Sequence, residues 1–350
     1  MSDNRMANRR NFLKVTGAAG VAGLTGLSGC TSGDSNDGGS QTTDASSGGS
    51  SEGTTTGSSS EPRTMTFALT PAESDVDIQQ QYQPLFNYLE EETNTTIEST
   101  VAADYAAVLQ ALESGQADIA DAAPAIAIQG ANEGVTQVVG IRIAYGASRY
   151  FSLITTTPDS DIESLTDLEG ETVAFADRLS TSGSLFPLYM LNQAGLDTGG
   201  APDGTPEDFT GQWSDHATAR ETLINRSEVV AAGTGAFSTA PHVPEDQFPE
   251  QFLEMSAEND GDLGTEDPEL QLLATSDPIP RAPILARADM DQELYAEVET
   301  ALLDVTEDQL INEDLSDDQQ LWFTGVAEGT ADDYQPVQNV LDALGVTLGQ

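Results

Sequence analysis

Apolar and polar positions follow two periods through most of the chain after residue 62. Short segments that alternate predict strands, and longer segments with apolar residues every three or four positions predict helices. The predicted strands cover residues 65–69, 96–101, 117–120, 137–144, 151–156, 171–175, 228–232 and 283–286. The predicted helices cover residues 79–93, 105–114, 184–194 and 217–225, with another from 124 and two or three after 292. Strands that alternate with helices predict an α/β fold whose largely parallel sheets are covered on both faces.

The first thirty residues have the pattern of a targeting segment and are excluded from the fold. Arg9 and Arg10, followed by Phe-Leu-Lys, resemble a twin-arginine export signal. The weakly apolar residues 15–27 are too short for a comfortable membrane span. They lead into Leu-Ser-Gly-Cys, which resembles a lipobox and implies a lipid on Cys30; a stray thiol in a linker is the alternative. Cys30 is the only cysteine, which excludes an intramolecular disulfide and a cysteine-cluster metal site.

Residues 31–62 consist almost entirely of Ser, Gly, Thr and Asp and contain no Leu, Ile, Val or aromatic residue. Such a segment cannot bury enough apolar surface to offset the entropy of ordering. We expect a flexible tether between the lipid and the folded part. The remaining residues 63–350 suffice for two lobes of ordinary domain size.

Charge adds a second expectation about the environment. The chain has 59 acidic and 12 basic residues, for a formal net charge of −47 at pH 7, and Lys14 is its only lysine. At molar salt the Debye length is about 3 Å, so repulsion among carboxylates spread along the chain is screened. We therefore favour adaptation to a high-salt medium, as in halophilic archaea, over an acidic surface for cations or a basic partner. The same charge argues against nucleic acid as a partner.

One loop has the chemistry of an anion site. Residues 180–183 read Ser-Thr-Ser-Gly and lie between a predicted strand and a predicted helix. The start of a helix presents free backbone N–H groups and a partial positive charge, and three hydroxyls add further donors. The pattern predicts a site for a tetrahedral oxyanion at Ser180, Thr181 and Ser182, with Gly183 allowing close backbone approach. An ordinary helix N-cap by Ser or Thr is the alternative.

Residues 63–350 resemble the periplasmic binding proteins of phosphonate, phosphite and phosphate ABC importers. The most specific segment is 167–187, where Asp-Leu-Glu-Gly-Glu-Thr-Val-Ala-Phe-Ala-Asp is followed by Ser-Thr-Ser-Gly and Pro187. Segments 84–89, 104–120 and 276–280 carry the rest of the match. The resemblance implies a type II periplasmic-binding-protein fold, with two α/β lobes of mixed sheets, two crossovers and ligand in the cleft. It places the first lobe in residues 63–156 and 276–350 and the second in 157–275.

The resemblance also implies which further residues contact the ligand. It places Tyr105, Tyr150 and His216 at family positions for ligand contact, with core tyrosines and a capping or surface histidine as alternatives. Where the family often has an aromatic-Gly pair, this chain reads Asp121-Ala122-Ala123-Pro124. Asp121 would repel an anion unless protonated or turned away, or it could accept a hydrogen bond from a protonated ligand oxygen. Arg149 and Arg178 flank these segments and could attract anions or form solvated ion pairs.

The expected function is capture of a phosphonate, phosphite or phosphate oxyanion without catalysis, cofactor or metal. We expect a monomer whose lobes close on the ligand and dock on a permease driven by ATPase subunits. A lipoprotein that reports to a receptor would share all these residues. A secreted serine hydrolase is disfavoured because no Gly-x-Ser-x-Gly elbow exists and only His216 and His242 could act as base.

Overall fold

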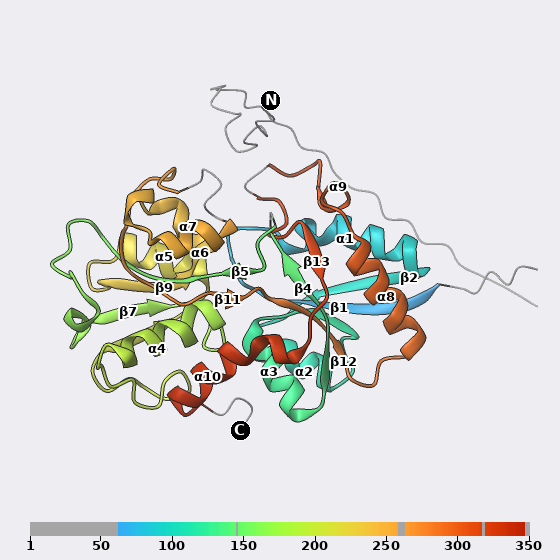
Figure 1. Ribbon diagram of the computed structural model, residues 1–350, viewed down its shortest axis with the longest axis horizontal. Coiled ribbons are helices and arrows are strands. Elements are labelled where there is room, and N and C mark those ends of the chain that lie inside the picture. Colours follow the sequence, from blue (N-terminus) through green and yellow to red (C-terminus); the bar gives the residue numbers. More distant parts are fainter. Residues whose placement is uncertain (1–61, 145, 258–262, 317–318, 347–350) are drawn as a thin grey trace, which may run out of the picture. The chain divides into compact units, whose positions relative to one another are not determined.

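The structure is a computed structural model that describes residues 62–144, 146–257, 263–316 and 319–346. Arg9, Arg10, Cys30 and the tether up to residue 61 lie outside the described residues, so their roles stay predictions. The described part contains two mixed sheets, each with helices on both faces (Figure 1).

The first sheet has the strand order β13-β4-β12-β3-β1-β2. Its strands are β1 (Arg63–Leu69), β2 (Thr95–Val101), β3 (Ile119–Asp121), β4 (Thr136–Ile143), β12 (Pro283–Arg287) and β13 (Gly325–Ala327). β1 runs parallel to β2 and β3, whereas β12 is antiparallel to both β3 and β4. The helices of this lobe are α1 (Ile78–Thr93), α2 (Tyr105–Glu113), α3 (Pro124–Glu133), α8 (Gln292–Asp304), α9 (Glu307–Leu310) and α10 (Gln335–Leu344).

The second sheet has the order β10-β6-β9-β7-β8. Its strands are β6 (Ser152–Thr156), β7 (Thr172–Phe175), β8 (Thr210–Trp213), β9 (Ala231–Gly235) and β10 (Gln271–Thr275). β7 is parallel to β8 and β9, and β6 is antiparallel to β9 and β10. The helices here are α4 (Phe186–Gln193), α5 (His216–Asn225), α6 (Ala236–Thr239) and α7 (Glu250–Met255), with a π-helical turn, Thr181–Leu185, leading into α4.

Side-chain alternation along the strands builds a core on each face of each sheet. In β1, Phe67 packs under α1 and α8, whereas its neighbour Ala68 packs under α2 and α3. In β7, Ala174 faces α5 and α7, and Phe175 faces α4. This period of two is the pattern from which the strands were predicted.

The chain crosses between the lobes through a two-stranded ladder of β5 (Arg149–Tyr150) and β11 (Ile279–Pro280), in which Ile279 pairs with Tyr150. The sequence places the first crossing near Thr156, but the structure puts β6 inside the second sheet. All five side chains of β6 are buried, and the strand has a partner on each side. The first lobe therefore ends at the ladder, about six residues earlier than expected, because a strand buried on both faces needs two neighbours to satisfy its backbone groups.

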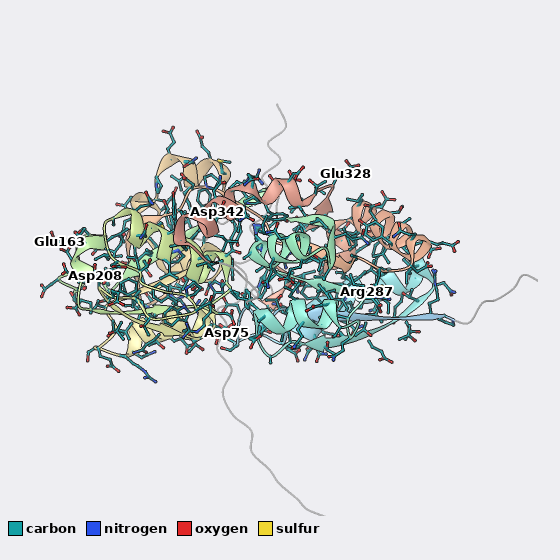
Figure 2. All side chains as sticks on the ribbon, turned by 90° about the horizontal axis from the view of Figure 1, so that it is seen from below. Asp75, Glu163, Asp208, Arg287, Glu328 and Asp342 are labelled. Carbon is teal, nitrogen blue, oxygen red and sulfur yellow. The ribbon has the colours of Figure 1, made fainter. Side chains whose placement is uncertain are left out.

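Aspartates begin several of the helices. Asp77, Asp104, Asp215 and Asp291 each accept a hydrogen bond from a backbone N–H in the first turn of α1, α2, α5 and α8, at 2.8–3.2 Å. Such caps satisfy donors that the helix cannot satisfy itself. Other carboxylates, among them Glu163, Asp208, Glu328 and Asp342, project from the surface (Figure 2). Acidic side chains therefore have two roles: some cap the N-termini of helices, and others are solvated at the surface.

The C-terminal part contains the helices expected after residue 292 and one strand that was not expected. It contains α8, α9 and α10, but also β13, which pairs antiparallel with β4 at the sheet edge. Three residues are too few to show an alternating pattern, so this strand could not be recognised. Among the described helices, none is long and apolar enough to cross a membrane.

Candidate ligand-binding site

A small cavity of about 70 Å³ lies where the two lobes and the crossover ladder meet. This volume is about twice the ~30 Å³ that one water occupies in the liquid. The first lobe, the second lobe and the ladder all supply polar groups to its wall: Thr70, Tyr105, Asp121, Arg142, Tyr150, Ser180, Thr181, Ser182, His216 and Arg281. Several of these follow the carboxyl ends of β1, β3 and β7, where open α/β sheets bind their ligands.

The structure brings the predicted residues together. Ser180, Thr181 and Ser182, together with Tyr105, Tyr150, His216 and Asp121, all line this one cavity. Arg149 and Arg178 are absent from the described wall. Arg178 instead lies over the ring of Trp213, with its guanidinium carbon 4.2 Å from the ring centre. Contact of the lining residues with a ligand stays a prediction.

The Ser-Thr-Ser row forms the start of the π-helical turn. Ser180 is the N-cap residue, and its Oγ accepts a hydrogen bond from the N–H of Gly183 at 3.1 Å. The Oγ1 of Thr181 accepts from the N–H of Ala125 at 2.9 Å, which joins the row to α3 of the other lobe. The N-cap alternative is therefore true of Ser180, yet the same residue also faces the cavity.

Gly183 lies behind the row and is not part of the cavity wall. A Cβ atom at this position would lie 2.3 Å from the Cβ of Ala176 and 2.6 Å from Cε1 of His216. The glycine thus lets the turn pack against the end of β7 and the start of α5. This packing, rather than approach to a ligand, is the role that the geometry gives it.

His216 is buried behind Ser180 with both ring nitrogens engaged. Its Nδ1 accepts from the N–H of Gly235 at 2.9 Å, and its Nε2 lies 3.0 Å from Oγ of Ser180. Burial lowers the pKa of His216 to about 3; Asp215 opposes this shift and Arg220 adds to it. The imidazole is therefore neutral at physiological pH.

Asp121 is committed to a protein partner. Its carboxylate lies 2.8 Å from NH1 of Arg142, and the side chains are 2% and 13% exposed. Burial raises the pKa of Asp121, and Arg142 and Tyr82 oppose that shift. Burial also disfavours the charged guanidinium, but Asp121 raises the pKa of Arg142 above its usual value. Arg142 therefore balances the charge of this carboxylate, and a hydrogen bond from a ligand proton to Asp121, which lines the cavity, stays a prediction.

Sequence reasoning missed several wall residues, among them Thr70, two arginines and three aromatic residues. Arg142 was read as part of a strand, and Arg281 follows the return segment. The charged side chains of the described wall are these two arginines and Asp121, so their net charge is +1 although the chain as a whole is very acidic. The aromatic residues Phe237, Trp322 and Phe323 complete the wall. An adjacent Trp-Phe pair in a polar, acidic segment was the available signal for the last two.

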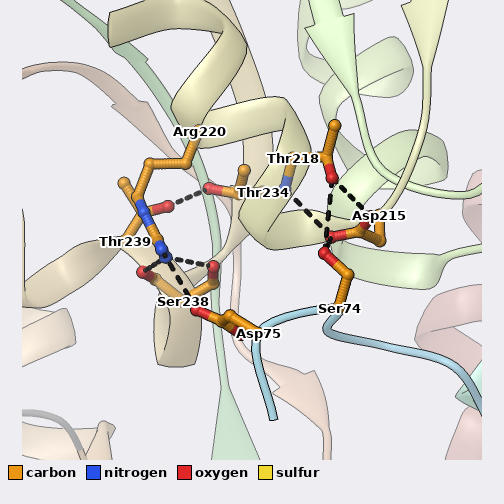
Figure 3. Close-up of polar contacts among 8 residues, drawn as sticks. All are labelled: Ser74, Asp75, Asp215, Thr218, Arg220, Thr234, Ser238 and Thr239. Carbon is orange, nitrogen blue, oxygen red and sulfur yellow. Dashed lines mark hydrogen bonds and ion pairs between the residues drawn. The ribbon is translucent and has the colours of Figure 1, made fainter. Parts of the chain in front are cut away.

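Further contacts join the lobes beside the cavity (Figure 3). Ser74 donates to Oδ1 of Asp215 at 3.1 Å, and Asp75 lies 3.7 Å from NH2 of Arg220. The N–H of His216 donates to the carbonyl of Ala72 at 3.3 Å. The segment after β1 is thus bound to the first two turns of α5, in an arrangement with the lobes in contact.

The described residues contain no cluster of three or more His, Cys, Asp or Glu side chains that could hold a metal ion. Solved structures share the fold. A binding-protein component of an ABC phosphonate transporter from Pseudomonas aeruginosa is 19% identical, with a TM-score of 0.61 over 81% of this chain and 87% of that one. PhnD1 from Prochlorococcus marinus, solved with methylphosphonate, is 15% identical, with a TM-score of 0.62 over 82% and 100%. At these identities the likeness establishes the fold, a type II periplasmic binding protein.

Sequence relatives agree over part of the chain. The phosphate-import protein PhnD of Mycolicibacterium smegmatis is 36% identical over 139 residues, which are 39% of this chain and 43% of that protein. The phosphonates-binding periplasmic protein of Escherichia coli is 27% identical over 134 residues, 37% and 40% respectively. The chain thus matches about two fifths of the length of these curated relatives. The family described as "ABC transporter, phosphonate, periplasmic substrate-binding protein" matches residues 67–334, well over half of the chain. The chain therefore belongs to the family of periplasmic substrate-binding proteins of phosphonate ABC transporters.

Proposed function

We propose that this chain captures a phosphonate, phosphite or phosphate oxyanion outside the cell and delivers it to a membrane permease powered by ATPase subunits. The observation that carries the proposal is the cavity itself. Three consecutive residues with hydroxyl groups, Ser180, Thr181 and Ser182, face it, and two arginines outnumber its single carboxylate. Charge-assisted hydrogen bonds of hydroxyls and guanidinium groups to an oxyanion are short and strong. The volume of about 70 Å³ suits a compact anion better than a nucleotide or a peptide.

The location is part of the same proposal. The pair Arg9 and Arg10 and the single Cys30 support export and attachment by lipid to the outer face of the cell membrane. A net charge of −47 and surface carboxylates on both lobes support a salt-rich medium (Figure 2).

Calorimetry at molar salt tests the ligand. Protein freed of bound ligand by unfolding and refolding would be titrated with methylphosphonate, phosphite, phosphate and sulfate. We expect at least one phosphorus oxyanion to bind, and Ser182→Ala and Tyr150→Phe each to weaken it by about tenfold, the value of one hydrogen bond to a charged group.

The matched control is Ser184→Ala in the same turn. The Oγ of Ser184 accepts from Nε1 of Trp213 at 2.9 Å and is not part of the wall. Its loss should leave affinity near the wild-type value. No binding of any of the four anions would refute the proposal, and equal effects at Ser182 and Ser184 would place the ligand elsewhere.

A further inference from the structure

The segment that follows β1 carries a carboxyl group into the contact between the lobes. Glu73 lies between Ala72, whose carbonyl accepts from the N–H of His216, and Ser74, whose hydroxyl donates to Asp215. Both partners belong to the start of α5 in the second lobe. Glu73 is partly buried as a residue, but its Oε1 atom is inaccessible to solvent and has no hydrogen-bond partner among the described residues. A negative charge on this oxygen would therefore be poorly compensated.

The groups that face the Glu73 carboxyl come from both lobes. α6 contributes the hydroxyl of Ser238, α5 contributes the guanidinium of Arg220, and Asp75 belongs to the same segment as Glu73. Arg220 is already engaged, because NH1 donates to the carbonyl of Ser238 and to its Oγ, the latter at 2.7 Å (Figure 3). NH2 of Arg220 also lies 3.7 Å from Asp75. No charged side chain comes from α6, which reads Ala-Phe-Ser-Thr.

Two carboxyl groups thus share one guanidinium at this contact. If both were ionised, the cluster of Glu73, Asp75 and Arg220 would carry one excess negative charge, part of it buried. Burial disfavours an uncompensated charge, so a proton on one of the two carboxyls is favoured. Asp75 is the more exposed of the two, with 49% of its side chain accessible, so the proton belongs on Glu73.

The pKa of Glu73 agrees with this count of charges. Burial, with a smaller contribution from Asp75, raises it from 4.5 to about 8, although Ser238 and Arg220 oppose the shift. Salt screens exposed charges far more than buried ones, so the effect of burial persists in a salt-rich medium.

Separation of the lobes would divide the cluster. Glu73 and Asp75 follow β1 of the first lobe, whereas Arg220 and Ser238 belong to α5 and α6 of the second. A hinge motion at the β5–β11 ladder would return the Glu73 carboxyl to water. We propose that Glu73 is a proton-binding group of the lobe interface, which takes up one proton when the lobes close on a ligand and releases it when they open. This inference rests on the proposed function and adds a second ligand, the proton, which binds outside the cavity wall.

The pH dependence of capture then has a definite sign. A group whose pKa is higher in the closed state favours closure most at a pH below its open-state pKa. That contribution is lost as pH rises through the closed-state pKa. For Glu73 this window extends from 4.5 to about 8. Capture should therefore be strongest in an acidic medium, and release should be easiest in an alkaline one.

Calorimetry of the wild-type protein and Glu73→Gln measures this proton. Methylphosphonate is titrated at 4 M NaCl in two buffers of different ionisation enthalpy, which gives the number of protons exchanged on binding. Proton changes of the ligand and of other groups are common to both proteins, so the difference between them reports Glu73. We expect the wild type to take up about one proton more than Glu73→Gln near pH 6–7, and no more near pH 10. From about pH 6 to 9, the wild-type affinity should fall about 10- to 100-fold more than that of the variant.

Glu113→Gln is the matched control, because Glu113 is exposed at the end of α2 and lies outside the cluster. It should exchange as many protons as the wild type. Equal proton exchange by the wild type and Glu73→Gln, with binding retained, would overturn this inference alone. No binding of methylphosphonate, phosphite, phosphate or sulfate would refute the proposed function and this coupling with it.

Infrared difference spectra of the wild-type protein decide the question if Glu73→Gln does not fold. Addition of methylphosphonate at about pH 7 should produce the C=O band of a protonated carboxyl group, a group that this ligand lacks. Binding without that band would show that closure leaves Glu73 ionised and would overturn the inference.

Discussion

The pair of Arg142 and Asp121 gives the sharpest prediction about stability. Arg142→Met keeps most of the aliphatic length but leaves the Asp121 carboxylate, 2% exposed, without its partner. At 2.8 Å the gross attraction is about 6 kcal/mol for an effective dielectric constant of ~20, and desolvation of both groups offsets much of it. Without the arginine the desolvation cost remains and the attraction is gone. We expect the free energy of unfolding to fall by about 3–5 kcal/mol.

Arg287→Met is the matched control in the same sheet. Nε of Arg287 lies 2.9 Å from Asp118, but the side chains are 26% and 22% exposed. Its loss should cost about 0–1 kcal/mol. Urea denaturation of ligand-free protein, followed by circular dichroism at 1 M and 4 M NaCl, measures both variants. The cost at Arg142 should persist at both salt concentrations, because a buried pair is screened little.

A cost at Arg142 no larger than at Arg287 would refute the reasoning. The double variant Asp121→Leu/Arg142→Met offers a second check, since replacing both members of a buried pair by apolar residues is often close to neutral. It should recover most of the loss of Arg142→Met. A double variant as unstable as the single one would show that packing, and not the unpaired charge, causes the loss.

Three further predictions concern other parts of the chain. Gly183→Ala should destabilise the protein by about 1–3 kcal/mol in urea and weaken ligand binding, whereas Gly200→Ala, whose new methyl would meet its nearest atom at 3.5 Å, should do neither. Burial, with a smaller contribution from Asp75, raises the pKa of Glu73 from 4.5 to about 8, so the native state holds this proton more tightly than the unfolded chain does. The melting temperature should therefore fall as pH rises from 5 to 9, and it should fall less in Glu73→Gln. Equal slopes in the two proteins would contradict this. Cys30→Ser should release the protein into the medium, while retention in the membrane fraction would count against the lipid anchor.

The sequence predicted most elements and seven of the residues that line the cavity. The alternation in residues 65–69 and the Ser-Thr-Ser-Gly row are local signals, and both correspond to structural features: β1 and the π-helical turn. β9 was expected at 228–232 but spans Ala231–Gly235. The strand continues through two glycines: a Cβ at Gly233 would lie 2.7 Å from Pro187, and one at Gly235 would lie 2.3 Å from Phe237. Only tertiary packing shows that this strand needs glycine.

The missed wall residues have the same explanation. In the sequence, Arg142 is one polar residue of a predicted strand. Its partner Asp121 ends β3, two strands away from β4 in the same sheet. The direction of the His216 hydrogen bond depends on the amide of Gly235, 19 residues further along the chain. Neither relation leaves a periodic signal in the sequence.

The aromatic contact between Phe237 and Trp322 has a consequence for observing the molecule. The rings stack with centroids 5.7 Å apart, and one comes from each lobe. The second tryptophan, Trp213, stacks on Phe175 at 5.3 Å within the second lobe. Separation of the lobes would move Trp322 into a more polar environment and leave Trp213 unchanged. The protein thus carries an intrinsic fluorescent reporter of its own opening, together with an internal reference.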